Sequence, residues 1–133
     1  MLYLLDTNIV SYLMEGNATV AQHLTKCLES GNIIMIPDIV YYEVQRGLLY
    51  NCSKRLQELF NSVCAYYGIL HTTNMDLYIA AEQYANLKRT GKLIEDDDIL
   101  IGSLAIAENA ILVTNNTKHL SRLQGIQLEN WAV

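Results

Sequence analysis

Short runs of apolar residues alternate along this chain with longer segments of helical periodicity. Four of the runs have the length of buried strands, and a weaker one near the C-terminus is expected to form an edge strand. The runs are Leu2 to Leu5, Ile33 to Ile36, Gly68 to Leu70, Ile111 to Val113 and, as the weaker one, Ile126 to Leu128. Such alternation is typical of α/β domains. The pattern predicts a central, largely parallel sheet of 4 to 5 strands flanked by helices.

The segments between these runs predict amphipathic helices. Apolar residues from Lys54 to Tyr67 follow i, i+3, i+4, i+7 spacing, and Ser53 is suited to cap that helix. A second helix is expected between a cap at Thr73 or Asn74 and an end near Gly91. Its apolar stripe consists of Leu77, Ala80, Ala81, Tyr84 and Leu87.

Two further helices are expected to carry acidic side chains. The segment from Ile99 to Ala107 is apolar nearly all round, which predicts a central, buried helix with Asp98 in its first turn. Pro37 follows a strand and is suited to start a helix, which places Glu43 about two turns into it.

Composition agrees with one ordered domain over residues 1–133. About half of the residues are hydrophobic (51%), 17% are charged and there is one proline, which excludes a disordered chain. No apolar run approaches the ~18 residues of a membrane span, and Asp6 interrupts what would have to be the apolar part of a signal peptide. We therefore expect a cytoplasmic protein without a membrane segment.

The cysteines and the net charge limit the classes of function that the chain can have. Cys27, Cys52 and Cys64 are widely spaced and form no CxxC pair, so we expect reduced packing residues. The net charge of −5 argues against a surface that coats nucleic acid. It does not exclude a nuclease, because carboxylates around a bound metal are neutralised locally.

Three acids at a distance in sequence occupy comparable settings. Asp6 follows the first strand, Glu43 lies beyond the second, and Asp98 begins the buried helix. The strand Ile111 to Val113 delivers Thr114, Asn115 and Asn116 to the same edge of a parallel sheet. Such oxygen donors are typical of a Mg²⁺ or Mn²⁺ site for phosphoryl chemistry, in which the metal activates water. Hydrolysis of a phosphodiester is the expected reaction.

Each of these positions also has a structural interpretation. Asp6 is equally suited to cap the helix beginning at Thr7, and Glu43 is suited to pair with Arg46 or with solvent. Glu95, Asp96 and Asp97 are better explained as a helix start, where acids favour the positive end of the helix dipole. Asn116 is suited to a turn or to capping the residues after it.

In this order the motifs resemble those of PIN-domain proteins, and among them the VapC-type toxins of bacterial toxin–antitoxin pairs. The resemblance covers nearly the whole chain. It rests on LLDTNIVSYL, PDIVYYEVQRGL, GKLIEDDDILIGSLAIAENAILVTNNTKHL and the closing QGIQLENW, of which the third is the most specific. It implies a PIN-like fold and a Mg²⁺- or Mn²⁺-dependent endoribonuclease. It also implies a homodimer and a cognate antitoxin that covers the groove.

The resemblance implies a role for particular residues. Asp6, Glu43 and Asp98 match the metal-binding acids, and Asn116 stands where many relatives carry a fourth acid. An amide has no charge, so whether one or two ions bind is left open, as is compensation by Asp96 or Asp97. The residues expected to orient the carboxylates or a bound water are Asn8, Thr114 and Thr7. The candidates for RNA-backbone contacts are Arg46, Lys92, Lys118 and Arg122.

Other function classes lack their signatures in this chain. It contains no GxxxxGK[ST], GxGxxG or GxSxG, and Ile69-Leu70-His71-Thr72 offers no phosphoacceptor aspartate for a receiver domain. A PIN fold that binds RNA or protein without catalysis is the remaining alternative, which Asn116 keeps open. The RNA that is cut and the identity of the antitoxin do not follow from the sequence.

Overall fold

A computed structural model describes residues 1–133. Five parallel strands form one sheet in the order β3-β2-β1-β4-β5. The strands are β1 (Leu2–Leu5), β2 (Ile33–Pro37), β3 (Ile69–Leu70), β4 (Ile111–Val113) and β5 (Gln127–Glu129). The predicted parallel sheet is confirmed, including the edge position of the last strand, which begins and ends one residue later than expected.

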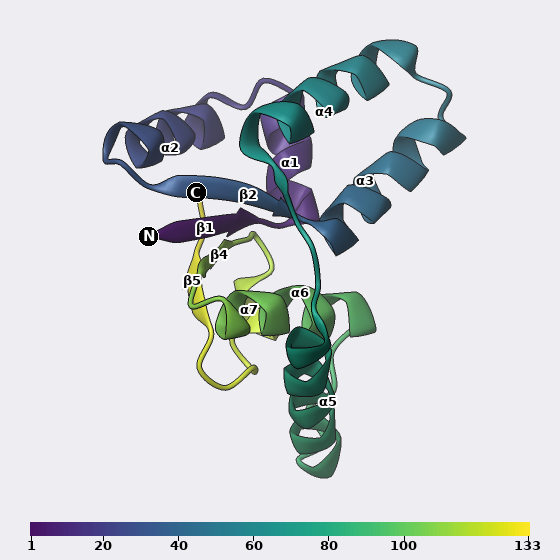
Figure 1. Cartoon of the computed structure of the whole chain (residues 1–133), viewed down its shortest axis with the longest axis vertical. Helices are drawn as coiled ribbons and strands as arrows, with labels where there is room; N and C mark the ends of the chain where they lie inside the picture. The colour runs from purple at the N-terminus through teal and green to yellow at the C-terminus, as the bar shows by residue number, and fades with distance from the viewer.

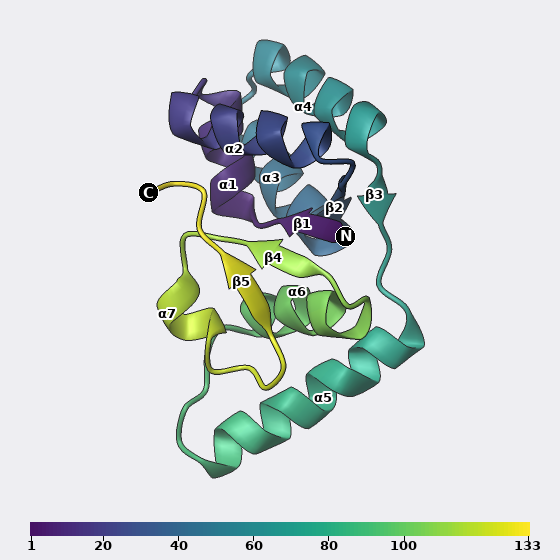
Figure 2. The same ribbon diagram turned by 90° about the vertical axis from the view of Figure 1, so that its left-hand side faces the viewer.

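Seven helices accompany the sheet. They are α1 (Thr7–Met14), α2 (Ala18–Glu29), α3 (Asp38–Tyr50), α4 (Lys54–Tyr67), α5 (Asn74–Arg89), α6 (Asp96–Ala107) and α7 (Thr117–Leu120). Helices α1 to α4 gather on one side of the sheet and α5 to α7 on the other (Figures 1 and 2). The two groups also meet directly, because α3 packs against α6. None of the helices is long and apolar enough to cross a membrane.

The core lies between the sheet and these helices. β1 and β4 supply fully buried leucines and Val113, and α6 supplies Ile101 and Leu104. The expectation of a central, buried α6 is therefore confirmed. Gly102 of α6 allows close packing there, since a Cβ at this position would overlap the end of the Leu123 side chain. Trp131, 2% exposed, holds the C-terminal tail against the ring of His23, with centroids 5.9 Å apart.

Two local predictions about packing are wrong. In α5 the expected stripe is only partly buried: Leu77 is 48% and Tyr84 38% exposed, whereas Asp76 and Gln83 face inward. The helix is rotated because Gln83 exchanges two hydrogen bonds with the backbone of Gln124, which fixes a polar side chain inside. Among the cysteines, Cys27 and Cys64 are buried as predicted, but Cys52 is exposed in the turn between α3 and α4.

Candidate functional site

The register of the two central strands places the first pair of polar residues side by side. Leu5 of β1 pairs with Val113 of β4, and the backbone N–H of Asp6 donates to the carbonyl of Val113 at 2.9 Å. Asp6 and Thr114 are therefore neighbours at the carboxyl end of the sheet, with both side chains on the same face. Ligand sites of open α/β sheets lie at this end, beside strands where the order of the chain reverses.

Asp6 is 4% exposed, and both of its carboxylate oxygens accept hydrogen bonds. The Thr114 hydroxyl donates to its Oδ2 at 2.7 Å, and the amide of Asn8 donates to the same oxygen at 3.3 Å. The backbone N–H of Thr7 donates to Oδ1 at 2.8 Å, which makes Asp6 the N-cap of α1. Asp6 therefore does cap α1. The capping hydrogen bond also orients its carboxylate, so capping does not exclude a role for Asp6 in the site.

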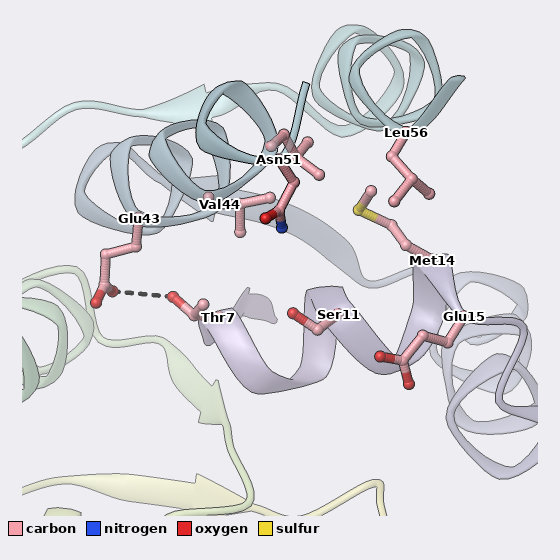
Figure 3. A pocket seen from close by; sticks show the side chains of 10 residues that line it. Thr7, Ser11, Met14, Glu15, Glu43, Val44, Asn51 and Leu56 are labelled. Atoms are coloured by element: carbon pink, nitrogen blue, oxygen red, sulfur yellow. Dashed lines mark hydrogen bonds between the residues drawn. The ribbon is translucent and has the colours of Figure 1, made fainter. Parts of the chain in front are cut away.

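Glu43 and Asp98 join the same network from the two helix groups. The Thr7 hydroxyl donates to Oε1 of Glu43 at 2.9 Å (Figure 3). The side-chain N–H of Asn116 donates to Oδ2 of Asp98 at 3.0 Å, while its backbone N–H donates to the Thr114 hydroxyl at 3.0 Å. The four predicted residues therefore meet at one edge of the sheet, linked through Thr7 and Thr114.

The remaining interpretations of these positions are resolved by their contacts. Arg46 approaches Glu43 at 3.9 Å, a long contact from a side chain that is 59% exposed and stacked on Tyr42. Asn116 occupies the N-cap position of α7, but its side chain makes no capping hydrogen bond there. Asn8 also contacts the chain after β4, since its Oδ1 accepts a hydrogen bond from the backbone N–H of Asn115 at 2.9 Å.

The sequence leaves open whether Asp96 or Asp97 belongs to the site. Asp96, Asp97 and Asp98 all lie in the first turn of α6, as expected for acids at a helix start. Asp97, however, is half-buried, and it lies close enough to Glu43 to raise the pKa of that residue. The linear sequence contains no signal for this proximity, because it depends on how α6 is rotated against α3.

Burial is the largest cause of the pKa shifts of Asp6, Glu43 and Asp98. Burial, and after it the hydrogen bond with Asp97, raises the pKa of Glu43 to about 7. Burial and then the charges of Asp6 and Asp97 raise the pKa of Asp98 to about 6. The pKa of Asp6 is also raised by burial, although the bonds from Thr114 and Thr7 oppose this. No lysine or arginine forms an ion pair with Asp6 or Asp98.

The donor atoms suit a hard divalent cation. Carboxylate oxygens are the ligands that Mg²⁺ and Mn²⁺ prefer, and no basic side chain of the protein pairs with Asp6 or Asp98. As the side chains stand, no group of three or more His, Cys, Asp or Glu residues is spaced to hold a metal ion directly. Mg²⁺ needs only one or two carboxylates and keeps several waters, so the residues fit an ion bound partly through water.

A pocket of about 310 Å³ extends from this network between α1, α3 and α4. Glu43 and Thr7 lie at one end, and Glu15 and Leu56 at the other (Figure 3). Polar and apolar side chains both line it. The polar ones include Ser11 and Asn51, and the apolar ones include Met14, Val44 and Leu48.

The predicted basic residues lie in different surroundings. Lys92 and Lys118 are exposed, as is Arg46 beside Glu43. Arg122 is exposed too, but its guanidinium donates to the carbonyls of Lys92 and Leu93 at 3.4 and 3.3 Å. Part of the function of Arg122 is therefore to hold the loop before α6.

Comparisons with known proteins agree with this geometry. The family model for the PIN domain matches residues 3–126. A relative named ribonuclease VapC2 from Rickettsia felis is 35% identical over 145 residues, which cover 98% of each chain. Ribonuclease VapC1 of Haemophilus influenzae is 29% identical over 147 residues, also 98% of each.

Solved structures show the same fold. The crystal structure of VapBC2 from Rickettsia felis, bound to a DNA fragment from its promoter, contains a chain that superposes with a TM-score of 0.89. That match has 33% identity over 98% of this chain and 99% of the other. A chain of VapBC-1 from nontypeable Haemophilus influenzae gives a TM-score of 0.88, with 25% identity over 100% of both chains.

Proposed function

This chain belongs to the PIN-domain family, and we propose that it is a divalent-metal-dependent endoribonuclease, the toxin of a VapBC-type toxin–antitoxin pair. The observation that carries the proposal is the convergence of Asp6, Glu43 and Asp98 at one edge of the sheet, within a network that holds each carboxylate in place. The relatives from Rickettsia felis and Haemophilus influenzae are named ribonucleases, which supports the same conclusion.

Asp6, Glu43 and Asp98 are the proposed ligands of Mg²⁺ or Mn²⁺. Such an ion supplies two kinds of chemistry when bound: it lowers the pKa of a coordinated water, and it stabilises negative charge that develops on a phosphate. The protein's own part is to orient the oxygens. Thr114 and Asn8 donate hydrogen bonds to Oδ2 of Asp6, and the backbone N–H of Thr7 donates to Oδ1. Asn116 donates to Oδ2 of Asp98 and leaves the other oxygen of that carboxylate free.

RNA is the proposed substrate, bound through its phosphates. Arg46, Lys92 and Lys118 are exposed basic side chains on segments next to the acidic network, so they are the proposed backbone contacts. Arg122 is proposed as an indirect contributor, since its hydrogen bonds fix the loop that carries Lys92. An acidic cluster repels RNA on its own, which is why these contacts and the bound cation are both needed.

An antitoxin is the proposed protein partner. Two solved structures that are similar to this chain are VapBC complexes, and the pocket between α1, α3 and α4 offers a place for a partner segment. A segment lying there would cover Glu43 and Thr7 and close one approach to the acidic network. Homodimerisation stays a prediction, which light scattering of the purified chain would check.

Cleavage of RNA by the purified chain tests the proposal. Wild type should cut RNA with Mg²⁺ or Mn²⁺, lose this activity with a chelator, and recover it when the metal is restored. Asp98→Asn should lower the rate at least 100-fold, because it removes a ligand charge. Asp96→Asn is the matched control, since Asp96 lies in the same helical turn but is exposed and faces α5.

The outcomes separate the proposed function from its alternative. Cleavage that resists the chelator, or full activity of Asp98→Asn, would refute the metal-dependent mechanism. A well-folded wild type that binds RNA without cutting it would support the non-catalytic PIN module. Growth arrest on expression that is relieved by a neighbouring antitoxin gene would identify the chain as a toxin, whereas a housekeeping ribonuclease would show no such relief.

A further inference from the structure

Another cavity, of about 340 Å³, lies between the loop before α6 and helix α7. It is lined by Leu93, Ile94, Glu95 and His119, and α6 packs against α7 beside it (Figure 2). Its volume is at the lower end of the range for sites that bind small molecules. None of the four lining residues takes part in the hydrogen-bond network of the acidic residues, so this cavity is a separate feature of the surface.

The cavity lies one helical turn away from the acidic network. Glu95 is the N-cap of α6 and precedes Asp98 by three residues, and Asn116 is the N-cap of α7 and precedes His119 by three residues. Side chains at these two positions of a helix are neighbours, and residues three apart have Cβ atoms about 5 to 6 Å apart. Asn116 donates to Asp98 at 3.0 Å, which joins the two helix starts. A nucleotide that adjoins a phosphate at Asp98 is therefore within reach of the cavity.

The wall that the loop forms is fixed before any ligand binds. The Arg122 guanidinium donates to the carbonyls of Lys92 and Leu93 at 3.4 and 3.3 Å. The backbone N–H of Lys92 donates to the carbonyl of Leu87 at 2.8 Å, which ties the loop to the end of α5. Leu93 nevertheless stays 42% exposed. A rigid loop that presents an apolar side chain to solvent binds an apolar surface without first having to become ordered.

The two polar side chains of the cavity are free to bind a ligand. Glu95 makes no capping hydrogen bond with its side chain and forms no ion pair. His119 is exposed and also forms no ion pair. A carboxylate accepts two hydrogen bonds side by side, and a histidine ring is a surface on which unpaired RNA bases stack. An apolar wall, a stacking ring and a pair of acceptors together match a nucleobase.

Guanine matches the pair of acceptors best. Its Watson–Crick edge carries two adjacent donors, N1–H and the N2 amino group, which one carboxylate can accept together. Adenine and cytosine present one donor beside an acceptor, and uracil presents N3–H between two carbonyl oxygens. Two exposed lysines, Lys92 and Lys118, come directly before Leu93 and His119, so basic side chains lie near both walls for the adjoining phosphates.

We propose that the cavity formed by Leu93, Ile94, Glu95 and His119 binds a guanine base of single-stranded RNA, next to the phosphate that is cut. Glu95 accepts N1–H and an N2–H of the base, His119 stacks on its ring, and the two apolar residues contact its other surfaces. A base that is read on its Watson–Crick edge is unpaired, so the substrate is single-stranded. The inference rests on the RNA substrate of the proposed function.

Binding of short RNAs in a chelating buffer tests the inference without cleavage. The probes are three fluorescein-labelled oligouridines, with one central guanine, one central adenine or no substitution. Each is titrated with the purified full chain, and fluorescence anisotropy gives its Kd. Wild type should bind the guanine-containing RNA at least about fivefold more tightly than the other two, as a bidentate contact to a base provides.

Substitution of Glu95 tests how the base is read. Glu95→Gln presents one acceptor and one donor, the pattern that matches adenine, so the preference for guanine over adenine should be lost or reversed. Glu108→Gln is the matched control, because Glu108 is exposed at the other end of the same helix, and it should keep the Kd ratios of wild type. Circular dichroism checks that both variants are folded.

Substitution of His119 tests the stacking contact. His119→Ala should weaken binding of the guanine-containing RNA at least about fivefold, the usual cost of removing a stacking side chain. His119→Phe keeps a flat ring and should bind this RNA nearly as well as wild type. His71→Ala, at an exposed histidine next to the edge strand β3, should leave the Kd unchanged.

The outcomes separate this inference from the proposed function. Equal Kd values of wild type for the three RNAs, or no measurable binding of any of them, overturn the inference, as does an unchanged guanine preference in Glu95→Gln. These results leave the proposed function intact if wild type still cuts RNA with Mg²⁺ or Mn²⁺. A folded wild type that prefers the guanine-containing RNA but cuts no RNA supports the base site and refutes the catalytic function.

Discussion

Replacing Glu43 by glutamine should stabilise the metal-free protein at alkaline pH while removing a proposed metal ligand. Glu43 has its pKa raised from 4.5 to about 7, first by burial and then by the hydrogen bond with Asp97. Its side chain is 12% exposed, so solvent screens it little. Glutamine is neutral at every pH and can donate a hydrogen bond to Asp97, as the protonated acid does.

The sign of the effect follows from proton linkage. Between pH 4.5 and about 7 the folded state binds more protons at Glu43 than the unfolded state, so the free energy of unfolding falls as pH rises. Above pH 7 the full penalty applies, at most about 3 kcal/mol for a pKa change of this size. The raised pKa of Asp98, about 6, acts in the same direction and remains in the variant.

Thermal unfolding across pH measures this penalty directly. In a chelating buffer at pH 8, Glu43→Gln should melt up to roughly 10 °C above wild type, and the gap should vanish below pH 4.5. Glu15→Gln is the matched control, because Glu15 is exposed at the far end of the same pocket. Mg²⁺ should raise the melting temperature of wild type more than that of Glu43→Gln. Parallel pH profiles for wild type and Glu43→Gln would refute the reasoning.

Two further substitutions test the hydrogen bonds around the site. Thr114→Val removes the hydroxyl that links Asp6 to Asn116 and should cost about 1 to 3 kcal/mol in denaturant unfolding, with a loss of activity. Thr25→Val, an exposed control, should cost under about 0.5 kcal/mol, and equal costs would contradict the buried role of Thr114. Asp38→Ala removes acceptors for the N–H and hydroxyl of Thr72, at 2.8 and 2.6 Å, which tie α3 to the chain before α5. It should cost about 2 to 3 kcal/mol, and an unchanged melting temperature would show that the tie is unimportant.

The parts of the fold that follow from the sequence are those set by local pattern. Apolar runs such as Leu2–Leu5 and Ile111–Val113 end where expected, because a buried parallel strand needs continuous apolar residues and stops at a polar one. When two neighbouring strands are parallel, the residues that follow them lie at the same edge of the sheet, the one formed by the carboxyl ends of the strands. The convergence of Asp6 with Thr114 is a consequence of this topology, which is why the sequence predicts it.

The parts that do not follow depend on partners far away in the chain. Gln83 looks like a surface residue in sequence, yet two hydrogen bonds to Gln124 allow it to be buried and turn Leu77 outward. Asp97 looks like a helix-start acid, and only the packing of α6 on α3 brings it to Glu43. In both cases a polar side chain finds its partner more than forty residues away, beyond the reach of periodicity.

The site is recognisable in the structure because it opposes folding. Buried carboxylates with raised pKa values destabilise a protein unless a positive charge compensates them, and here no basic side chain does so for Asp6 or Asp98. The surrounding hydroxyls and amides orient these groups at a cost that a simple apolar core would avoid. Residues that oppose the stability of the fold are expected at functional sites, because function and not stability determines their identity there. A bound cation would offset this cost, and the alkaline stability of Glu43→Gln measures the part that Glu43 contributes.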